Sequence, residues 1–112
     1  MTLEEYFTTG PPHERPVFDA VMRHRAVGPV YVEPVSVGIF FKNVGKFAEL
    51  RPMQKWVALS FSLPRPVRHR TIVRKVVLWH GRYFHIANLA RPEDFDDDLA
   101  AWLTEAYVFA GD

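Results

Sequence analysis

The sequence contains no cysteine and no long apolar run. Without cysteine, a disulfide framework, thiolate ligation of zinc and a cysteine nucleophile are all excluded. No apolar run approaches the roughly 20 residues that a membrane-spanning helix needs, and the first five residues do not form a basic and apolar secretion signal. The expected location is therefore the cytoplasm, and no membrane contact is predicted.

Recognisable catalytic motifs are also missing. The six glycines form neither a phosphate-binding loop nor a dinucleotide fingerprint, and Ser36, Ser60 and Ser62 lack the glycine-flanked elbow of a serine nucleophile. Five histidines, at positions 13, 24, 69, 80 and 85, have no helical partner four residues away and no carboxylate at ligand spacing. The sequence therefore predicts no catalytic residue, no metal and no cofactor.

The length and composition of the chain are typical of one folded domain. A chain of 112 residues is long enough to bury one core. Its 48% of apolar and 24% of charged residues are ordinary for a folded protein, so disorder is not expected. We predict a single domain over residues 1–112, without a linker.

Both ends of the chain carry helix signals. Thr2 followed by Glu5 has the spacing of a capping box and predicts a short helix that ends at Gly10. From Pro12, apolar residues recur every three or four positions, which predicts an amphipathic helix that ends before Gly28. Near the other end, Pro92 with its acidic neighbours begins a last helix. Its apolar face is Phe95, Leu99, Trp102, Leu103 and Ala106.

Between these helices the period of the apolar residues changes to two, which is typical of strands. A first long strand is expected to place Val35, Val37, Ile39 and Phe41 on its core face. A two-residue turn at Val44–Gly45 then puts Ala48 opposite Phe41 and Leu50 opposite Ile39.

The later strands are expected to continue the same core face. On one of them it consists of Val57, Leu59, Phe61 and Leu63. Around a hairpin at Gly81 it consists of Val77, Trp79, Phe84 and Ile86. The predicted fold class is α+β, with about five antiparallel strands and the N-terminal and C-terminal helices packed on one face of the sheet.

The opposite face of this predicted sheet is both aromatic and polar. It carries Phe40, Lys42, Phe47, Trp56, Ala58, Ser60, Ser62, Tyr83 and His85. Aromatic rings for base stacking, together with a cation for phosphate, are how several small domains hold single-stranded nucleic acid. The alternative is that Tyr6, Phe7 or a second subunit covers this face.

Charges are segregated along the chain, although the net charge is only +1. Residues 42–82 carry ten Lys or Arg against one acid, and residues 83–112 carry one Arg against seven acids. Within the basic block, Arg68, Arg70 and Arg74 in and after a proline-punctuated loop are candidates to contact phosphates. The alternative is that the two blocks neutralise each other within the fold.

The aspartates at 96, 97 and 98 are a candidate cation cluster that the helical geometry disfavours. Consecutive helical residues point about 100° apart, so three neighbouring aspartates do not converge on one ion. The sequence favours an acidic first turn that is stabilised by the helix dipole.

Three stretches of the chain resemble a family of small bacterial domains called domain of unknown function 5655. They are residues 37–42 with 45–52, the hairpin residues 82–86, and the ending 91–107. The resemblance implies a stand-alone domain, but no catalytic residue, cofactor or partner. More distantly, residues 45–48 and the acidic last helix are similar to YjbR-type α+β domains, for which a DNA-binding role has been suggested.

Three functional hypotheses remain. The first is a non-enzymatic domain that binds nucleic acid or another anionic partner through the basic loop and the aromatic sheet face. The second is a protein-interaction or dimerisation module in which Phe40, Phe47 and Trp56 pack on a second subunit or partner protein. The third is a small-ligand-binding domain or an enzyme with a pocket around His85, to which Tyr83 and Ser60 contribute.

Overall fold

The computed structural model describes residues 1–24, 30–43 and 45–111, and these form an α+β fold. Its strands are β1 Tyr31–Val35, β2 Gly38–Lys42, β3 Lys46–Pro52, β4 Val57–Leu63, β5 Val77–Trp79 and β6 Arg82–Leu89. Its helices are α1 Leu3–Thr9, α2 Glu14–His24 and α3 Asp97–Gly111, with a 3-10 turn, η1, at Pro92–Asp94. The strands form one antiparallel sheet in the order β1-β2-β3-β4-β6-β5.

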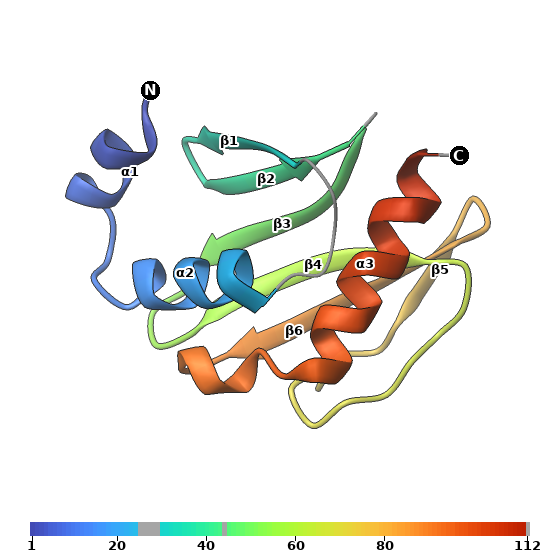
Figure 1. The fold of residues 1–112 in the computed structure, drawn as a ribbon. Helices are drawn as coiled ribbons and strands as arrows, with labels where there is room; N and C mark the ends of the chain where they lie inside the picture. The colour runs from blue at the N-terminus through green and yellow to red at the C-terminus, as the bar shows by residue number, and fades with distance from the viewer. Residues whose placement is uncertain (25–29, 44, 112) are drawn as a thin grey trace.

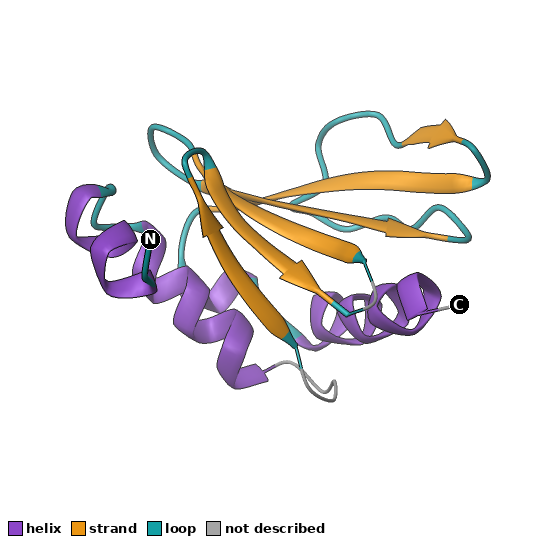
Figure 2. Cartoon of the chain, turned by 90° about the horizontal axis from the view of Figure 1, so that it is seen from above, coloured by secondary structure: helices purple, strands orange, loops and turns teal. Residues whose placement is uncertain are grey.

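The helices gather on one face of the sheet, as the sequence predicts. Figure 1 shows α2 and α3 crossing the same face, and the view in Figure 2 separates this helical layer from the strands. Side chains that point toward the helices are shielded from water, and Ile39, Leu50 and Leu59 are fully buried. No helix among the described residues has both the length and the apolar character needed to cross a membrane.

The predicted N-terminal helix is confirmed at both ends. The Thr2 hydroxyl accepts a hydrogen bond of 3.1 Å from the Glu5 N–H, and the helix ends with Gly10 as its C-cap. This cap satisfies one of the backbone donors that a helix leaves free at its start. The predicted end of the second helix, before Gly28, lies outside the described residues.

The predicted first long strand is wrong, because the chain folds back within it. β1 and β2 form a hairpin in which Val35 pairs with Gly38, so Val37 lies exposed in the turn. This turn raises the strand count from the predicted five to six. Gly38 is required there, because a Cβ atom would clash with the backbone carbonyl of Leu50. Ser36 and the flanking Pro34 and Gly38 are common turn residues, but the two-residue alternation of Val35, Val37 and Ile39 favours a continuous strand and conceals this reversal.

The registers predicted for the central strands are confirmed. Ile39 pairs with Leu50 and Phe41 with Ala48, and the side chains of Leu59 and Phe61 on β4 are buried as expected. The turn residue Val44 itself lies outside the described residues.

The predicted facing of β6 is wrong. The hairpin turn has positive φ at His80 and Gly81, and Val77 pairs with Phe84, so those side chains share a face as expected. That face, however, is the one turned away from the helices. Ala87 and Leu89 instead fill the core beside Leu59 and Val57, and the two-residue alternation then turns His85 inward and Phe84 and Ile86 outward.

The predicted last helix is split into η1 and α3. An Asp96 carboxylate oxygen accepts a hydrogen bond of 3.1 Å from the Leu99 N–H and so caps the start of α3. Asp94 caps the preceding turn through the N–H groups of Ala90 and Arg91. Two of the neighbouring acids are therefore capping groups, as the interpretation of an acidic first turn requires.

Candidate functional site

The face of the sheet turned away from the helices, here called the open face, has no described helix packed over it (Figure 2). One row of cross-strand neighbours runs through Phe40, Glu49, Ser60 and Ile86. Parallel rows place Arg51, Ala58 and Asn88 on one side of it, and Ser62 and Phe84 on the other.

Two hollows adjoin on the open face and share Glu49 and Ser60. The first has a volume of about 250 Å³ and is lined further by Arg51, Met53, Trp56, Arg74, Ile86 and Asn88. The second, of about 180 Å³, is lined further by Lys46, Phe47, Ala48, Phe61, Ser62 and Phe84. An aromatic ring and a cation therefore stand at each hollow, with hydroxyl and amide groups between them.

Charges on the open face are only partly paired. The Glu49 carboxylate binds Lys46 at 3.1 Å and Arg51 at 3.2 Å, and Lys42 binds Glu33 at 2.9 Å. Lys46 also lies 4.4 Å from the centre of the Phe40 ring.

Arg74 stands apart from these pairs. It lines the larger hollow, and its guanidinium makes no ion pair with any described residue. Four cations, those of Lys42, Lys46, Arg51 and Arg74, thus face two carboxylates on the open face.

The basic loop, residues 64–76, is in part neutralised by the acidic end of the chain. Arg65 binds Glu105 on α3 at 2.8 Å, and Arg70 binds Asp94 at 3.0 Å. Burial alone raises the pKa of Asp94, but hydrogen bonds from Ala90, Arg70 and the Arg91 N–H outweigh it and hold that pKa below its usual value. Arg70 is therefore paired with Asp94, although its side chain is still 60% exposed, whereas Arg68 is exposed and has no ion pair among the described residues.

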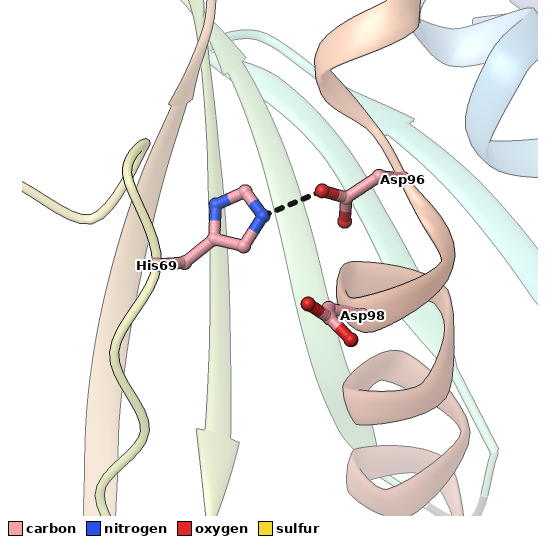
Figure 3. Close-up of side chains that lie close together, drawn as sticks. All are labelled: His69, Asp96 and Asp98. Atoms are coloured by element: carbon pink, nitrogen blue, oxygen red, sulfur yellow. Dashed lines mark hydrogen bonds and ion pairs between the residues drawn. The ribbon is translucent and has the colours of Figure 1, made fainter.

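His69 anchors the same loop to the start of α3. The Thr71 N–H donates to His69 Nδ1 at 3.2 Å, so Nδ1 is an acceptor and Nε2 carries the proton that bonds Asp96 at 2.8 Å. Figure 3 shows Asp98 directed toward the same space. One ligand atom from each of His69, Asp96 and Asp98 lies within 4.8 Å of the other two. Consecutive aspartates do not converge, but two alternate ones meet a histidine.

His85 does not form the pocket that the third hypothesis needs. Its ring is buried in the core, stacked on Phe61 at 5.0 Å between ring centres, and its Nε2 accepts a hydrogen bond of 3.1 Å from the Val67 N–H. Burial lowers the pKa of His85 and keeps the ring neutral. Tyr83, two residues before it, faces the same side of β6. Both residues were wrongly predicted on the open face.

Phe47 lines the smaller hollow, but its ring does not stand on the open face as predicted. The ladder between β2 and β3 passes from Phe41–Ala48 to Lys42–Lys46, which leaves Phe47 as the extra residue of a bulge. Its ring is buried, with its centre 5.4 Å from that of Tyr107 on α3. Simple alternation would point the Phe47 side chain outward, but the bulge turns it toward the core.

A family model described as "Domain of unknown function" (DUF5655) matches residues 3–110. The chain belongs to this family. No curated protein and no solved structure matches it. The comparisons do not show the expected similarity to YjbR-type domains. Because the DUF5655 description assigns no function, the site has to be argued from the geometry of this chain.

The structure brings together half of the residues that the sequence proposed as a site. Phe40, Lys42, Trp56, Ser60 and Arg74 lie on or beside the open face. Arg68 and Arg70 lie in the loop outside both hollows. Sequence reasoning missed Glu49, Arg51, Phe84, Ile86 and Asn88. Extending the alternation of β6 to Ala87 and Leu89 was the signal that could have found the last three.

Proposed function

We propose that this domain is a non-enzymatic binding protein whose open face holds an anionic, ring-containing partner, with single-stranded nucleic acid as first choice. The observation that carries this proposal is the pair of adjoining hollows on an uncovered sheet, each with an aromatic ring and a cation. A single strand offers both chemical groups that such a surface recognises, because its bases stack on rings and its phosphates attract cations.

Each part of the open face has a role in this proposal. Trp56 and Phe84 lie in different hollows, so they supply stacking surfaces for two different bases. Arg74, which has no ion pair among the described residues, contacts a phosphate. Between the hollows, Ser60 and Glu49 offer hydrogen-bonding groups to base edges.

Fluorescence anisotropy of labelled single-stranded and duplex oligonucleotides tests the proposal. We expect the single strand to bind more tightly, and its affinity to fall with salt by a log–log slope of about 0.7 for each phosphate contacted. Replacing Trp56 by alanine should cost about 1–3 kcal/mol of binding free energy, the usual value for one stacked base.

Two charge reversals separate the open face from general electrostatic attraction. Arg74→Glu should weaken binding at low salt by about tenfold or more, because it places a carboxylate beside a phosphate. Arg23→Glu makes the same change in net charge on the helical side, where Arg23 lines a separate cleft between α2 and η1. It should have a much smaller effect. Equal losses in both variants, or no binding by the parent at low salt, would contradict the proposal.

A second candidate function, a protein-interaction or dimerisation module, is favoured by the edge strand β5. All three of its side chains are exposed, Trp79 by 62%, and one edge of the strand has no described partner. Exposed apolar edge strands are templates for pairing with another chain. Sedimentation equilibrium tests a dimer built on this edge: the parent should dimerise and Trp79→Lys should not. A monomeric parent would rule this dimer out.

A further inference from the structure

The space between the loop 64–76 and the start of α3 has the side chains of a cation site. His69 comes from the loop, Asp96 from the residue that caps α3, and Asp98 from the first turn of that helix (Figure 3). The His69 side chain is only 5% exposed, whereas both carboxylates reach solvent. A buried imidazole thus faces two carboxylates at an opening from which an ion and its waters can enter.

One imidazole nitrogen and two carboxylates form a ligand set for a divalent first-row metal ion. Zinc binds histidine nitrogen at about 2.0–2.1 Å and carboxylate oxygen at about 2.0–2.2 Å, so ligands of a tetrahedral ion lie about 3.4 Å apart. The three ligand atoms here lie within 4.8 Å of one another. Asp98, which is exposed and makes no hydrogen bond or ion pair with a described residue, can close that difference by changing rotamer.

The surroundings of His69 supply the support that a metal-bound histidine needs. Its Nδ1 lies 2.7 Å from the Thr71 hydroxyl, which can accept a hydrogen bond as readily as donate one. When Nε2 gives up its proton to bind an ion, the other tautomer places a proton on Nδ1 that the hydroxyl accepts. The cost is the bond of 3.2 Å from the Thr71 N–H, which loses its acceptor.

The charges around the cluster also favour a cation. Two positive charges lie nearby: Arg70 is engaged by Asp94 at 3.0 Å, and Arg23 lines a cleft with Asp96. Glu93 and Asp97 add two exposed carboxylates on neighbouring turns. Carboxylates therefore outnumber the arginine side chains around the opening.

From this geometry we propose that His69, Asp96 and Asp98 bind one divalent transition-metal ion, with Zn²⁺ as the reference ion and water at the remaining position. The ion joins the basic loop to α3 in place of the single hydrogen bond between His69 and Asp96. This site is independent of the open face, since none of its three ligands lines either hollow there.

Isothermal titration of the untagged full chain with Zn²⁺ in a non-chelating buffer tests the site. We expect one ion per chain and a rise in melting temperature, because an ion that binds only the folded state stabilises it. Asp98→Asn should weaken the affinity at least tenfold. This variant should fold normally, because Asp98 has no hydrogen bond or ion pair to lose among the described residues.

Asp97→Asn is the matched control, since it removes the same charge one position away, in an exposed residue outside the group of three whose ligand atoms lie within 4.8 Å of one another. Its affinity should stay within about threefold of the parent, as should that of the exposed His80→Ala. The proposal is overturned if the parent binds no Zn²⁺ at millimolar concentration. It is equally overturned if Asp97→Asn weakens binding as much as Asp98→Asn does, or if His80→Ala abolishes it.

Discussion

The two faces of the sheet are built from alternate residues of the same strands, yet they obey different rules. On β4, Leu59 turns inward and is fully buried, while its neighbour Ser60 turns outward between the two hollows. The covered face buries few polar groups, and one of them is the carboxylate of Glu14, which accepts a hydrogen bond of 2.8 Å from the Tyr6 hydroxyl. The open face carries ion pairs, rings and hollows that the packing of the core does not require.

This difference separates residues that are needed for stability from residues whose chemistry is better explained by binding. Inward residues contribute through area removed from water, about 25 cal/mol for each Å² of apolar surface. Outward residues on an uncovered sheet gain little of that energy. A cluster of aromatic and charged side chains on the open face is therefore a better guide to binding than the same residue types in the core.

The most direct test of the difference between the two faces is to truncate two neighbouring side chains on β4, one from each face. Leu59→Ala should lower the free energy of unfolding by about 2–5 kcal/mol, because it leaves a cavity in a fully buried site. Ser60→Ala, one residue away, should change it by less than about 0.5 kcal/mol. Urea unfolding of both variants measures the two values. Similar losses would show that the open face is packed as tightly as the covered one.

The buried pair of Tyr6 and Glu14 gives the next largest effect. Glu14 is fully buried, and burial raises the pKa of its carboxyl against the opposing influence of the Tyr6 hydrogen bond. Tyr6→Phe removes the only hydrogen bond found for that carboxyl within the described residues and should cost about 1–3 kcal/mol. Tyr31→Phe alters an exposed edge residue and should cost almost nothing. Chemical unfolding compares the two, and a stable Tyr6→Phe variant would refute this account of the pair.

The inward position of His85 predicts a pH dependence of stability. Because burial lowers its folded pKa, the unfolded chain takes up the proton first as the pH falls. Its contribution is therefore complete above the unfolded pKa of about 6.5 and is lost at lower pH. His85→Gln should show a smaller loss of stability between pH 7 and pH 5 than the parent, in urea unfolding at each pH. Equal losses would mean that His85 is not the titrating group.

The smallest expected effect concerns the loop that crosses from one side of the sheet to the other. Arg65 is exposed and binds Glu105, so Arg65→Gln should cost about 0.2–1 kcal/mol and less at high salt. Arg68→Gln is the control, because Arg68 has no ion pair among the described residues and should cost nothing measurable. Thermal unfolding at two salt concentrations distinguishes them. A larger loss for Arg68 would reverse the assignment of the anchor.

Local signals were sufficient for much of the fold. The cap at Thr2 and the register that pairs Ile39 with Leu50 depend on residues close in sequence. Both can therefore be predicted without knowing how distant parts of the chain pack. The β1–β2 turn was missed because the alternation of Val35, Val37 and Ile39 conceals the turn residues Ser36 and Gly38, and the requirement for Gly38 comes from a carbonyl on another strand.

The candidate sites were harder to predict, because they depend on facing and on distant contacts. β6 has apolar residues on both faces, so its alternation favours His85 inward and Phe84 outward only when it is followed to Asn88 and Leu89. His69 and Asp96 are 27 residues apart and meet only because the loop folds back beneath the sheet onto α3. No spacing rule for metal ligands anticipates that meeting.

The measurement that tests the open face most directly is methyl NMR of the isoleucines during titration with a single-stranded oligonucleotide. The chain has only three, at positions 39, 72 and 86, and the structure places Ile39 in the core and Ile86 at the larger hollow. We predict that the Ile86 methyl signal shifts with bound base rings while Ile39 stays unchanged. Binding that leaves Ile86 unmoved, or a titration that moves no signal, would contradict the account.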